Sequence, residues 1–325
     1  TAKLAVKAGA NLLVHSVDNS SIDQEFIDLL KTNDVVYCPT LIVSANYTKV
    51  LTQNYQPTSE DYQYGPPKPL GSLLDIRHLP EPALKNRYLD LADLLKRSDE
   101  QADDIMAENL MKLINADVPI ATGTDAGNIG TMHVSSYFEE LRWMKKAGMS
   151  NAQILEASTI NGAKAVGKSA EFGSVAVGKR ADLLVLNQNP LEDIAHLKEV
   201  EVVINKGTVI EKTLVPNSPA QLAQQQLNAY NGHNLEAFLA PYAEDVKIYT
   251  FPNKLNFEGK EIMREQYQFI EQNPDLHCEL VSRIVEGNTI IDHEKVTIDK
   301  NRPPFKAIAI YKIKDGKIAE VYFIQ

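Results

Sequence analysis

The sequence predicts an α/β protein that carries a separate α+β domain at its C-terminal end. Over the first 165 residues, short apolar strands alternate with amphipathic helices, which is typical of a parallel sheet or barrel. From Phe172 the pattern changes to short strands with glycine turns, which indicates a small antiparallel unit. After the linker Pro216–Pro219 the organisation of helices and strands starts again.

Apolar runs and amphipathic runs give the elements of the first part. The predicted strands are Asn11–His15, Val35–Cys38 and Val118–Thr122. The predicted helices are Ser20–Leu30, Asp99–Asn115, Val134–Lys146 and Asn151–Ala165. Residues 44–97 interrupt this alternation with tyrosines and prolines and without clear periodicity, so we interpret them as a lid-like insertion over a substrate site.

The C-terminal domain has its own set of elements. The predicted helices are Ala220–Asn231, Asn234–Leu239 and Gly259–Gln272. The predicted strands are Val246–Thr250, His277–Glu286, Thr289–Asp299, Phe305–Lys314 and Lys317–Gln325. Five aromatic or histidine side chains either line a cavity under the curved sheet or form a packed aromatic core: Tyr230, Tyr249, Phe251, His277 and His293. Asp292 and Glu294 flank His293, so both should face away from it.

Composition excludes several classes of protein. The 325 residues carry 33 Lys+Arg and 43 Asp+Glu, and this acidic balance argues against a nucleic-acid binder. No apolar run approaches the roughly 18 residues of a membrane span. Cys38 and Cys278 stand in apolar contexts and read as buried thiols. Because residue 1 is Thr and stands inside a helical pattern, we expect the sequence to be a fragment, which leaves the compartment open between cytoplasm and periplasm.

Two side chains at predicted strand ends could carry chemistry. Asp125 follows the strand in VPIATGTDAGN, at the edge where parallel barrels hold their active sites, although a turn aspartate is an equal alternative. His15 ends the strand NLLVH, where a metal ligand competes with a satisfied core histidine. Together, nitrogen and oxygen ligands on one rim suit zinc or a similar divalent ion. His133 lies in the loop after Asp125, where it either contacts substrate or merely begins the next helix.

Three segments together resemble the C-terminal half of an amidohydrolase-superfamily enzyme, of the imidazolonepropionase-like and prolidase-like branch. They are AGANLLVHSVDNSSIDQEFIDLLKTNDVVYCPTL, VPIATGTDAGNIGTMHVSSYFEELRWMKKAGMSNAQILEASTINGAKAVG, and FGSVAVGKRADLLVLNQNPLEDI followed by VVINKGTVI. The resemblance covers roughly residues 1–213. It implies strands six to eight of a (β/α)8 TIM-type barrel over 1–168, with the insertion 44–97, and strands of a small β-sandwich over 169–214.

The same resemblance assigns roles to the candidate residues. It makes His15 a metal ligand, Asp125 both a ligand and the general base, and His133 a substrate contact. The family's His-x-His pair has no counterpart among the seven histidines, and the bridging lysine and fifth-strand histidine also lack one. The resemblance therefore implies one or two divalent ions, zinc by preference, in a site that this chain completes only in part. We expect the chain to hydrolyse nothing alone.

Residues 218–325 resemble the nuclear transport factor 2 and steroid delta-isomerase superfamily (SnoaL-like). The similar segments are LNAYNGHNLEAFLAPYAEDVKIYTFP, FEGKEIMREQYQ, HCELVSRIVEGNTIIDHEKVTI and AIAIYKIKDGKIAEVYFI. This resemblance implies a cone-shaped α+β domain with an open pocket, frequently dimeric, so that a homodimer could form through it. The fold alone does not define an activity, because such a cone hosts enzymes and binding modules alike.

These observations give one leading hypothesis and an alternative. The leading hypothesis is a metal-dependent amidohydrolase that cleaves a carbon–nitrogen bond of a small cyclic amide or dipeptide substrate, with Asp125 as the base. The alternative is a non-catalytic module in which the C-terminal cone binds a small ligand or forms a dimer, or a cone with an isomerase-type activity. Neither hypothesis involves a nucleic acid or a membrane span as a partner.

Overall fold

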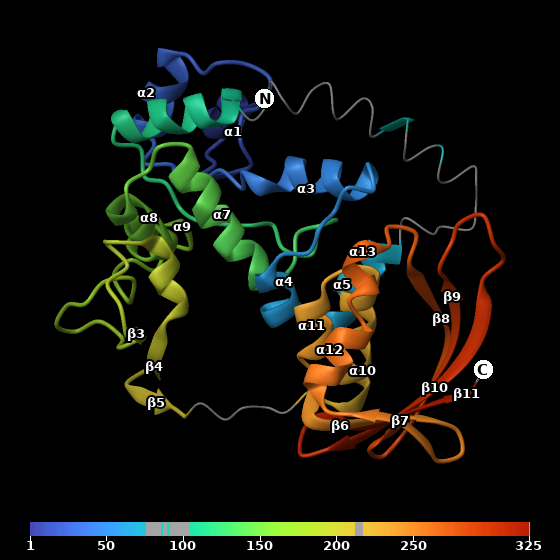
Figure 1. The fold of residues 1–325 in the computed structure, drawn as a ribbon. Helices are drawn as coiled ribbons and strands as arrows, with labels where there is room; N and C mark the ends of the chain where they lie inside the picture. Colours follow the sequence, from blue (N-terminus) through green and yellow to red (C-terminus); the bar gives the residue numbers. More distant parts are fainter. Residues whose placement is uncertain (76–85, 87–89, 92–103, 212–216, 325) are drawn as a thin grey trace. The chain divides into compact units, whose positions relative to one another are not determined.

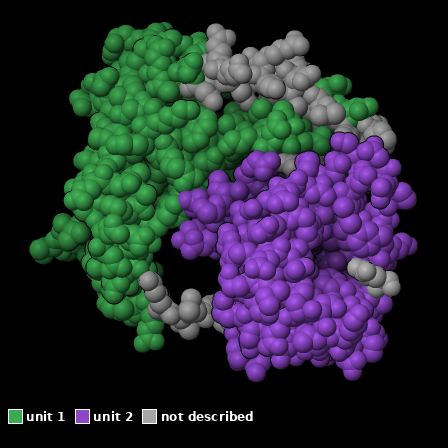
Figure 2. Space-filling view, in the orientation of Figure 1, with its two compact units in different colours: residues 1–54, 83–213 green, residues 55–82, 214–325 purple. Residues whose placement is uncertain are grey.

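The computed structural model describes the chain except for residues 76–85, 87–89, 92–103, 212–216 and 325, and these described residues fall into two compact units. Unit 1 comprises residues 1–54 and 83–213, and unit 2 comprises residues 55–82 and 214–325 (Figures 1 and 2). Among the described residues, no helix combines the length and the apolar character that crossing a membrane requires.

The first sheet of unit 1 is parallel, as the alternation of strands and helices predicts. Strand β1 (Leu12–Val14) pairs in parallel with β2 (Val36–Cys38), and helix α2 (Gln24–Thr32) connects them. The third predicted strand joins through a single parallel bridge between Tyr37 and Ile120. Unit 1 is therefore built from strand–helix units of the kind that form a TIM-type barrel.

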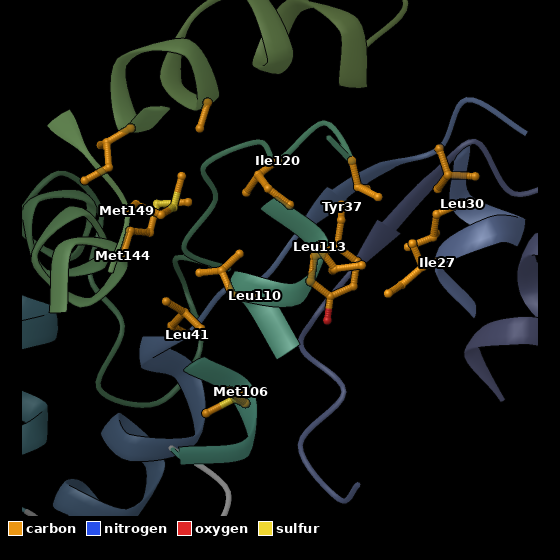
Figure 3. Close-up of a cluster of buried hydrophobic side chains, with 14 of the residues drawn as sticks. Ile27, Leu30, Tyr37, Leu41, Met106, Leu110, Leu113, Ile120, Met144 and Met149 are labelled. Carbon is orange, nitrogen blue, oxygen red and sulfur yellow. The ribbon is translucent and has the colours of Figure 1, made fainter. Parts of the chain in front are cut away.

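Helices surround this sheet and enclose one apolar core. They are α1 (Ala2–Lys7), α2, α3 (Ile42–Leu51), a helix over residues 104–115, α7 (Ser135–Lys146), α8 (Asn151–Ser158) and α9 (Ile160–Ala165). Figure 3 shows the centre of the core, where Tyr37 of β2 lies among side chains of the 104–115 helix and α2. The buried side chains include Leu30, Leu110, Leu113, Met144, Met149 and Ile154.

Two helix boundaries differ from the prediction. Helix α2 starts at Gln24 and not at Ser20, because the carboxylate of Asp23 caps it by accepting a hydrogen bond from the amide of Phe26. The predicted helix Asn151–Ala165 is broken at Thr159, whose φ of −124° and ψ of −90° are not helical. Of the predicted helix Asp99–Asn115, residues 99–103 lie outside the described part.

A small antiparallel sheet follows the barrel segment, as the glycine-rich turns predict. Strand β4 (Val200–Asn205) lies between β3 (Leu183–Leu186) and β5 (Thr208–Ile210). The 3-10 helix η2 (Ile194–Lys198) connects β3 to β4, and the buried Ile194 anchors it in the core of unit 1.

The C-terminal part of unit 2 is a six-stranded sheet with helices packed on one face (Figure 1). In the order of the sheet, the strands are β7 (Lys254–Glu258), β6 (Tyr242–Thr250), β11 (Lys317–Ile324), β10 (Phe305–Lys314), β9 (Thr289–Thr297) and β8 (His277–Glu286). The helices are α10 (Pro219–Asn231), α11 (Leu235–Leu239), α12 (Lys260–Gln266) and α13 (Phe269–Gln272). The α+β prediction holds, although β7 is an additional strand and the predicted helix Gly259–Gln272 is divided into α12 and α13.

Part of the lid-like insertion belongs to unit 2. Helices α4 (Ser59–Tyr64) and α5 (Pro67–Asp75) lie in this unit, and α5 packs on α10. The side-chain amide of Asn228 donates to the carbonyl of Pro67 at 2.6 Å. A β-carbon at Gly71 would lie 2.6 Å from Oδ1 of Asn228, so glycine is what allows the two helices to approach this closely. Most of residues 76–97 lie outside the described part, and the role of the insertion as a substrate lid stays a prediction.

Candidate functional site

The structure brings His15 and Asp125 together at the carboxyl ends of two strand segments that both pair with β2. His15 follows β1, and its amide donates to the carbonyl of Cys38 at 3.0 Å. Asp125 follows the segment that is bridged to β2. Nε2 of His15 lies 3.8 Å from Oδ2 of Asp125, and the two side chains are 54% and 39% exposed. The pair is thus reachable from solvent at the carboxyl edge of these parallel strands.

The backbone at this edge adopts an unusual conformation at three successive strand ends. His15, Thr40 and Asp125 have φ values of 71°, 46° and 52°. Left-handed backbone is uncommon for residues other than glycine, and it tends to cluster at functional sites. Its effect here is to turn the chain sharply after each strand, which leaves the three polar side chains at one rim. Nδ1 of His15 lies 2.9 Å from the hydroxyl oxygen of Thr40.

A second layer of hydrogen bonds holds Asp125 in place. The side-chain amide of Asn128 donates to Oδ2 of Asp125. The hydroxyl of Tyr47 in α3 donates in turn to Oδ1 of Asn128 at 2.7 Å. Asn128 therefore links the carboxylate to a helix from another part of unit 1. Hydrogen bonds of this kind orient ligand or catalytic side chains, and they were not apparent from the sequence.

His133 lies on the same loop as Asp125. Its exposed ring is next to Gly127, since a β-carbon built on that glycine would lie 3.9 Å from Cε1 of His133. The amide of Gly127 donates to the carbonyl of Thr131, and this bond closes the loop into a tight turn. The loop thus places His133 near the Asp125 turn, and its contact with a substrate stays a prediction.

Small residues allow the strands to approach each other behind this rim. A β-carbon at Gly123 would lie 2.4 Å from Sγ of Cys38, so the thiol fills the space beside the glycine. Burial raises the pKa of the Cys38 thiol to about 12. Cys38 therefore stays protonated near neutral pH and serves as packing, in line with the buried thiol that its sequence context predicts.

A buried carboxyl group stabilises the turn that follows Thr40. Glu140 of α7 is fully buried and accepts hydrogen bonds from the amides of Leu41 and Ile42 at 2.9 and 3.1 Å. Burial raises the pKa of Glu140 to about 8. This residue fixes the turn that carries Thr40 into α3. The sequence held a signal for it, because Glu140 is an acidic residue within the apolar face of α7.

His15 and Asp125 fit a divalent ion as two of its ligands. Two ligand atoms that bind one zinc ion tetrahedrally lie about 3.4 Å apart, which is close to the observed 3.8 Å. A catalytic zinc site uses three protein ligands and keeps one position open. Within the described part of the chain, no group of three or more His, Cys, Asp and Glu side chains could hold a metal ion. The described residues thus bring two possible donors together, and a metal site would need a third.

Unit 2 contains a separate cavity of about 260 Å³ between its sheet and helices. Of the seventeen described residues that line it, nine are aromatic. They are Tyr230, Phe238, Tyr242, Phe257, Tyr267, Phe269, Phe305, Tyr311 and Phe323. The sequence analysis placed Tyr230 at a cavity or in a packed core, and Tyr230 lines this cavity. The other four residues of that group do not line the cavity: Tyr249, Phe251, His277 and His293. The ring of Tyr249 instead stacks on the ring of Tyr322, with the ring centroids 4.6 Å apart.

One carboxyl group lies among the residues that line this cavity. Glu294 of β9 is 6% exposed, and its Oε1 accepts a hydrogen bond from the hydroxyl of Tyr311 at 3.1 Å. The side-chain amide of Gln226 donates to the Tyr311 hydroxyl at 2.9 Å. Burial, together with the nearby charge of Asp292, raises the pKa of Glu294 to about 7. Asp292 and Glu294 share the buried register of β9 with Ile290 and Val296 and face away from His293, as predicted.

Two family models match the chain. Residues 74–210 match the model described as the amidohydrolase family, and residues 223–321 match the model described as a SnoaL-like domain. The first match includes Asp125 and His133 and leaves out His15. The two matches follow one another along the chain in the order that the sequence resemblances predict.

The chain is also similar to curated relatives and to a solved structure. An imidazolonepropionase of Geobacillus sp. (strain WCH70) is 33% identical over 110 residues, which are 33% of this chain and 26% of the relative. A probable imidazolonepropionase of Homo sapiens is 43% identical over 70 residues, 20% of this chain and 16% of the relative. A crystal structure of a Xaa-Pro dipeptidase with methionine in its active site is 25% identical, with a TM-score of 0.43, and the match covers 64% of this chain and 42% of that one. The chain thus spans 26% and 16% of the length of these two curated relatives.

Proposed function

Because the chain carries an amidohydrolase-family region followed by a SnoaL-like domain, we propose that it belongs to a metal-dependent hydrolase of carbon–nitrogen bonds. Asp125 acts as the general base in this proposal. The substrate is a small cyclic amide or a dipeptide, which is the chemistry that the names of the imidazolonepropionase and Xaa-Pro dipeptidase relatives indicate.

The observation that carries the proposal is the convergence of His15 and Asp125. Their Nε2 and Oδ2 atoms lie 3.8 Å apart, although the residues come from different strand ends. An imidazole nitrogen and a carboxylate oxygen at this separation are a typical pair of ligands for a divalent ion. The remaining donors would have to come from outside the described residues, since these hold no larger group of metal-binding side chains.

The roles of the chain's own residues follow from their hydrogen bonds. When bound, a divalent ion, zinc by our preference, would supply a water of lowered pKa. Asp125 takes the proton of the attacking water and returns it to the leaving nitrogen. Asn128 holds Oδ2 of Asp125, which orients Oδ1 for this transfer. His133, on the same loop, contacts the substrate.

The substitution Asp125→Asn tests the assignment of the base. In a protein that carries this chain together with the remaining metal ligands, the change should lower kcat by at least about 10³-fold and leave the fold intact. Asp117→Asn is a matched control, because Asp117 precedes the same strand segment and also has a positive φ, of 58°. Activity that survives Asp125→Asn would show that another group is the base.

A second candidate function resides in the C-terminal domain. We propose that this domain binds a small molecule, because it contains a largely aromatic cavity of about 260 Å³ with one buried carboxyl group. Cavities with apolar walls and a few polar groups are the usual form of small-molecule sites. An isomerase-type reaction or a homodimer through this domain remains compatible with such a site. Thermal shift of unit 2 with small aromatic compounds tests it, and the absence of any shift would contradict binding.

A further inference from the structure

We propose that the cavity of the C-terminal domain binds a small organic cation, an ammonium group on an apolar or aromatic body, with Glu294 as its counter-ion. This inference rests on the second proposed function, small-molecule binding by unit 2, and assigns a chemical class to the ligand. It is carried by three features: the charge of the cavity lining, the ion pair that engages the guanidinium of Arg283 with Asp292, and the aromatic character of the walls.

The lining of the cavity carries an acidic group without a basic one. Glu294 is the carboxyl group among the described lining residues, and these residues include no Lys, Arg or His. A carboxylate that is 6% exposed in an aromatic site is costly unless a cation lies beside it. A ligand with a positive charge would supply what the lining lacks.

The basic side chain whose charge acts on Glu294, Arg283, is already engaged in an ion pair. Arg283 of β8 donates to both carboxylate oxygens of Asp292, with both distances at 2.7 Å. The same guanidinium also donates to the side-chain oxygen of Gln224 on α10 at 3.0 Å. Asp292 is completely buried, so this two-pronged ion pair is fixed in place. Arg283 therefore neutralises Asp292 and leaves Glu294 available to a ligand.

The walls suit a cation as well as an apolar group. Rings from α10, α11 and the end of α12 surround the cavity, and the centroids of Phe238 and Tyr267 lie 5.0 Å apart. The faces of such rings attract ammonium groups, most strongly where water is excluded. Phe269 and Phe305 are each 40% exposed, which places aromatic edges where the cavity meets solvent.

The tyrosine hydroxyls near Glu294 stay neutral around pH 7. Burial raises the pKa values of Tyr311 on β10, Tyr242 on β6, Tyr267 after α12 and Tyr230 on α10, so all four hydroxyls keep their protons. Cys278 of β8 also faces Glu294 as a buried thiol. Asp292 and Arg283 are paired with each other, and the pKa of Glu294 is about 7.

Calorimetric titration of the full chain with benzyltrimethylammonium tests the proposal. This cation cannot lose a proton, so any effect of pH on binding comes from the protein. If only the ionised form of Glu294 binds it, and the pKa of Glu294 is about 7, the affinity should rise about 30-fold between about pH 5.5 and about pH 8.5. Glu294→Gln should abolish both the binding and its pH dependence.

Two further measurements separate this inference from the function on which it rests. Glu279→Gln on neighbouring β8 removes an exposed carboxylate and should leave the titration unchanged. Acetophenone is the neutral probe, because its carbonyl would accept a hydrogen bond from protonated Glu294. Binding of acetophenone but not of the cation would overturn the cation proposal and retain small-molecule binding. Cation binding that survives Glu294→Gln would also overturn it, and binding of neither probe would overturn both proposals.

Discussion

Nε2 of His15 lies 3.8 Å from Oδ2 of Asp125, while Nδ1 of the same ring lies 2.9 Å from the hydroxyl of Thr40. The imidazole is therefore held on one side and directed toward a carboxylate on the other. Thr40 and Asn128 occupy equivalent positions in this arrangement, since each bonds one member of the pair. The pair is thus oriented from both sides before any ligand arrives.

Asn128 should matter for zinc binding although it is not itself a predicted ligand. Asn128→Ala removes the donor that holds Oδ2 of Asp125, and we expect zinc affinity to fall about 10- to 100-fold. Tyr47→Phe removes only the hydroxyl that holds Asn128 and should have a smaller effect in the same direction. Calorimetric zinc titration of the chain measures both effects. Asn11→Ala, an exposed change at the start of β1, is the control, and equal affinities in all variants would contradict the role of Asn128.

Glu140 should make unit 1 less stable as the pH rises. Its pKa is about 8 in the folded chain and ordinarily 4.5, so the folded state holds its proton more tightly than the unfolded state. The stabilisation is complete below pH 4.5 and is lost as the pH rises from 4.5 to about 8. Glu140→Gln keeps an oxygen for the amides of Leu41 and Ile42 and should remove this dependence.

The only tryptophan of the sequence makes the effect of Glu140 measurable. Trp143 lies in α7 and packs against the core of unit 1, so its fluorescence reports the unfolding of this unit. Urea unfolding at several pH values measures the free energy of unfolding of the wild type and of Glu140→Gln. The difference between the two values should stay constant below about pH 4.5 and change as the pH rises above it. Identical pH dependence of the two proteins would mean that Glu140 is ionised when folded.

Gly123 and Cys38 should behave as a coupled pair. Gly123→Ala places a β-carbon 2.4 Å from Sγ of Cys38, and we expect a loss of about 1–3 kcal/mol in the free energy of unfolding. Cys38→Ala in the same protein removes the sulfur and should recover part of that loss. Trp143 fluorescence again measures it, with Cys38→Ala alone as the control. Additive effects of the two changes would show that the residues are not in contact.

Gly71 should be essential for the packing of α5 on α10. Gly71→Val directs a branched side chain at Asn228 and Gln224, whose atoms would lie within 2.8 Å of the new β-carbon. We expect unit 2 to lose about 1–3 kcal/mol of stability, with faster amide hydrogen exchange in α10. Lys68→Val in the same helix is exposed and serves as the control. Unchanged exchange in α10 would contradict the assignment of α5 to this unit.

The part of the site that follows from strand ends was predictable from the sequence. Asp125 and His15 each come directly after an apolar run, and parallel strands bring such positions to one edge. Asn128 and Tyr47 were not predictable, because their bond joins a loop to a helix far away in the sequence. Glu294 faces a cavity because its position in β9 is buried, and alternation showed only that it lies opposite His293.

The fold, too, was predictable only where it follows from local sequence patterns. Strand–helix alternation predicts the parallel strands of unit 1 and the change to antiparallel strands after Phe172, because periodicity is a local property. Periodicity does not identify the element on which an amphipathic helix packs. The packing of α5 on α10 therefore could not be predicted from the sequence. The start of α2 was misplaced for a related reason, since Ser21 and Asp23 are both good caps and the carboxylate of Asp23 is the one that bonds Phe26.

The protonation and metal response of the His15 ring test the central claim most directly. If His15 and Asp125 are two ligands of one ion, Nδ1 carries the proton and donates it to Thr40, and Nε2 is free to bind metal. Nitrogen NMR of the chain should therefore show the Nδ1–H tautomer. Added zinc should shift Nε2 of His15 in the wild type, and much less in Asp125→Asn. A proton on Nε2, donated to Asp125 and insensitive to zinc, would contradict the metal site and leave an ordinary hydrogen-bonded pair.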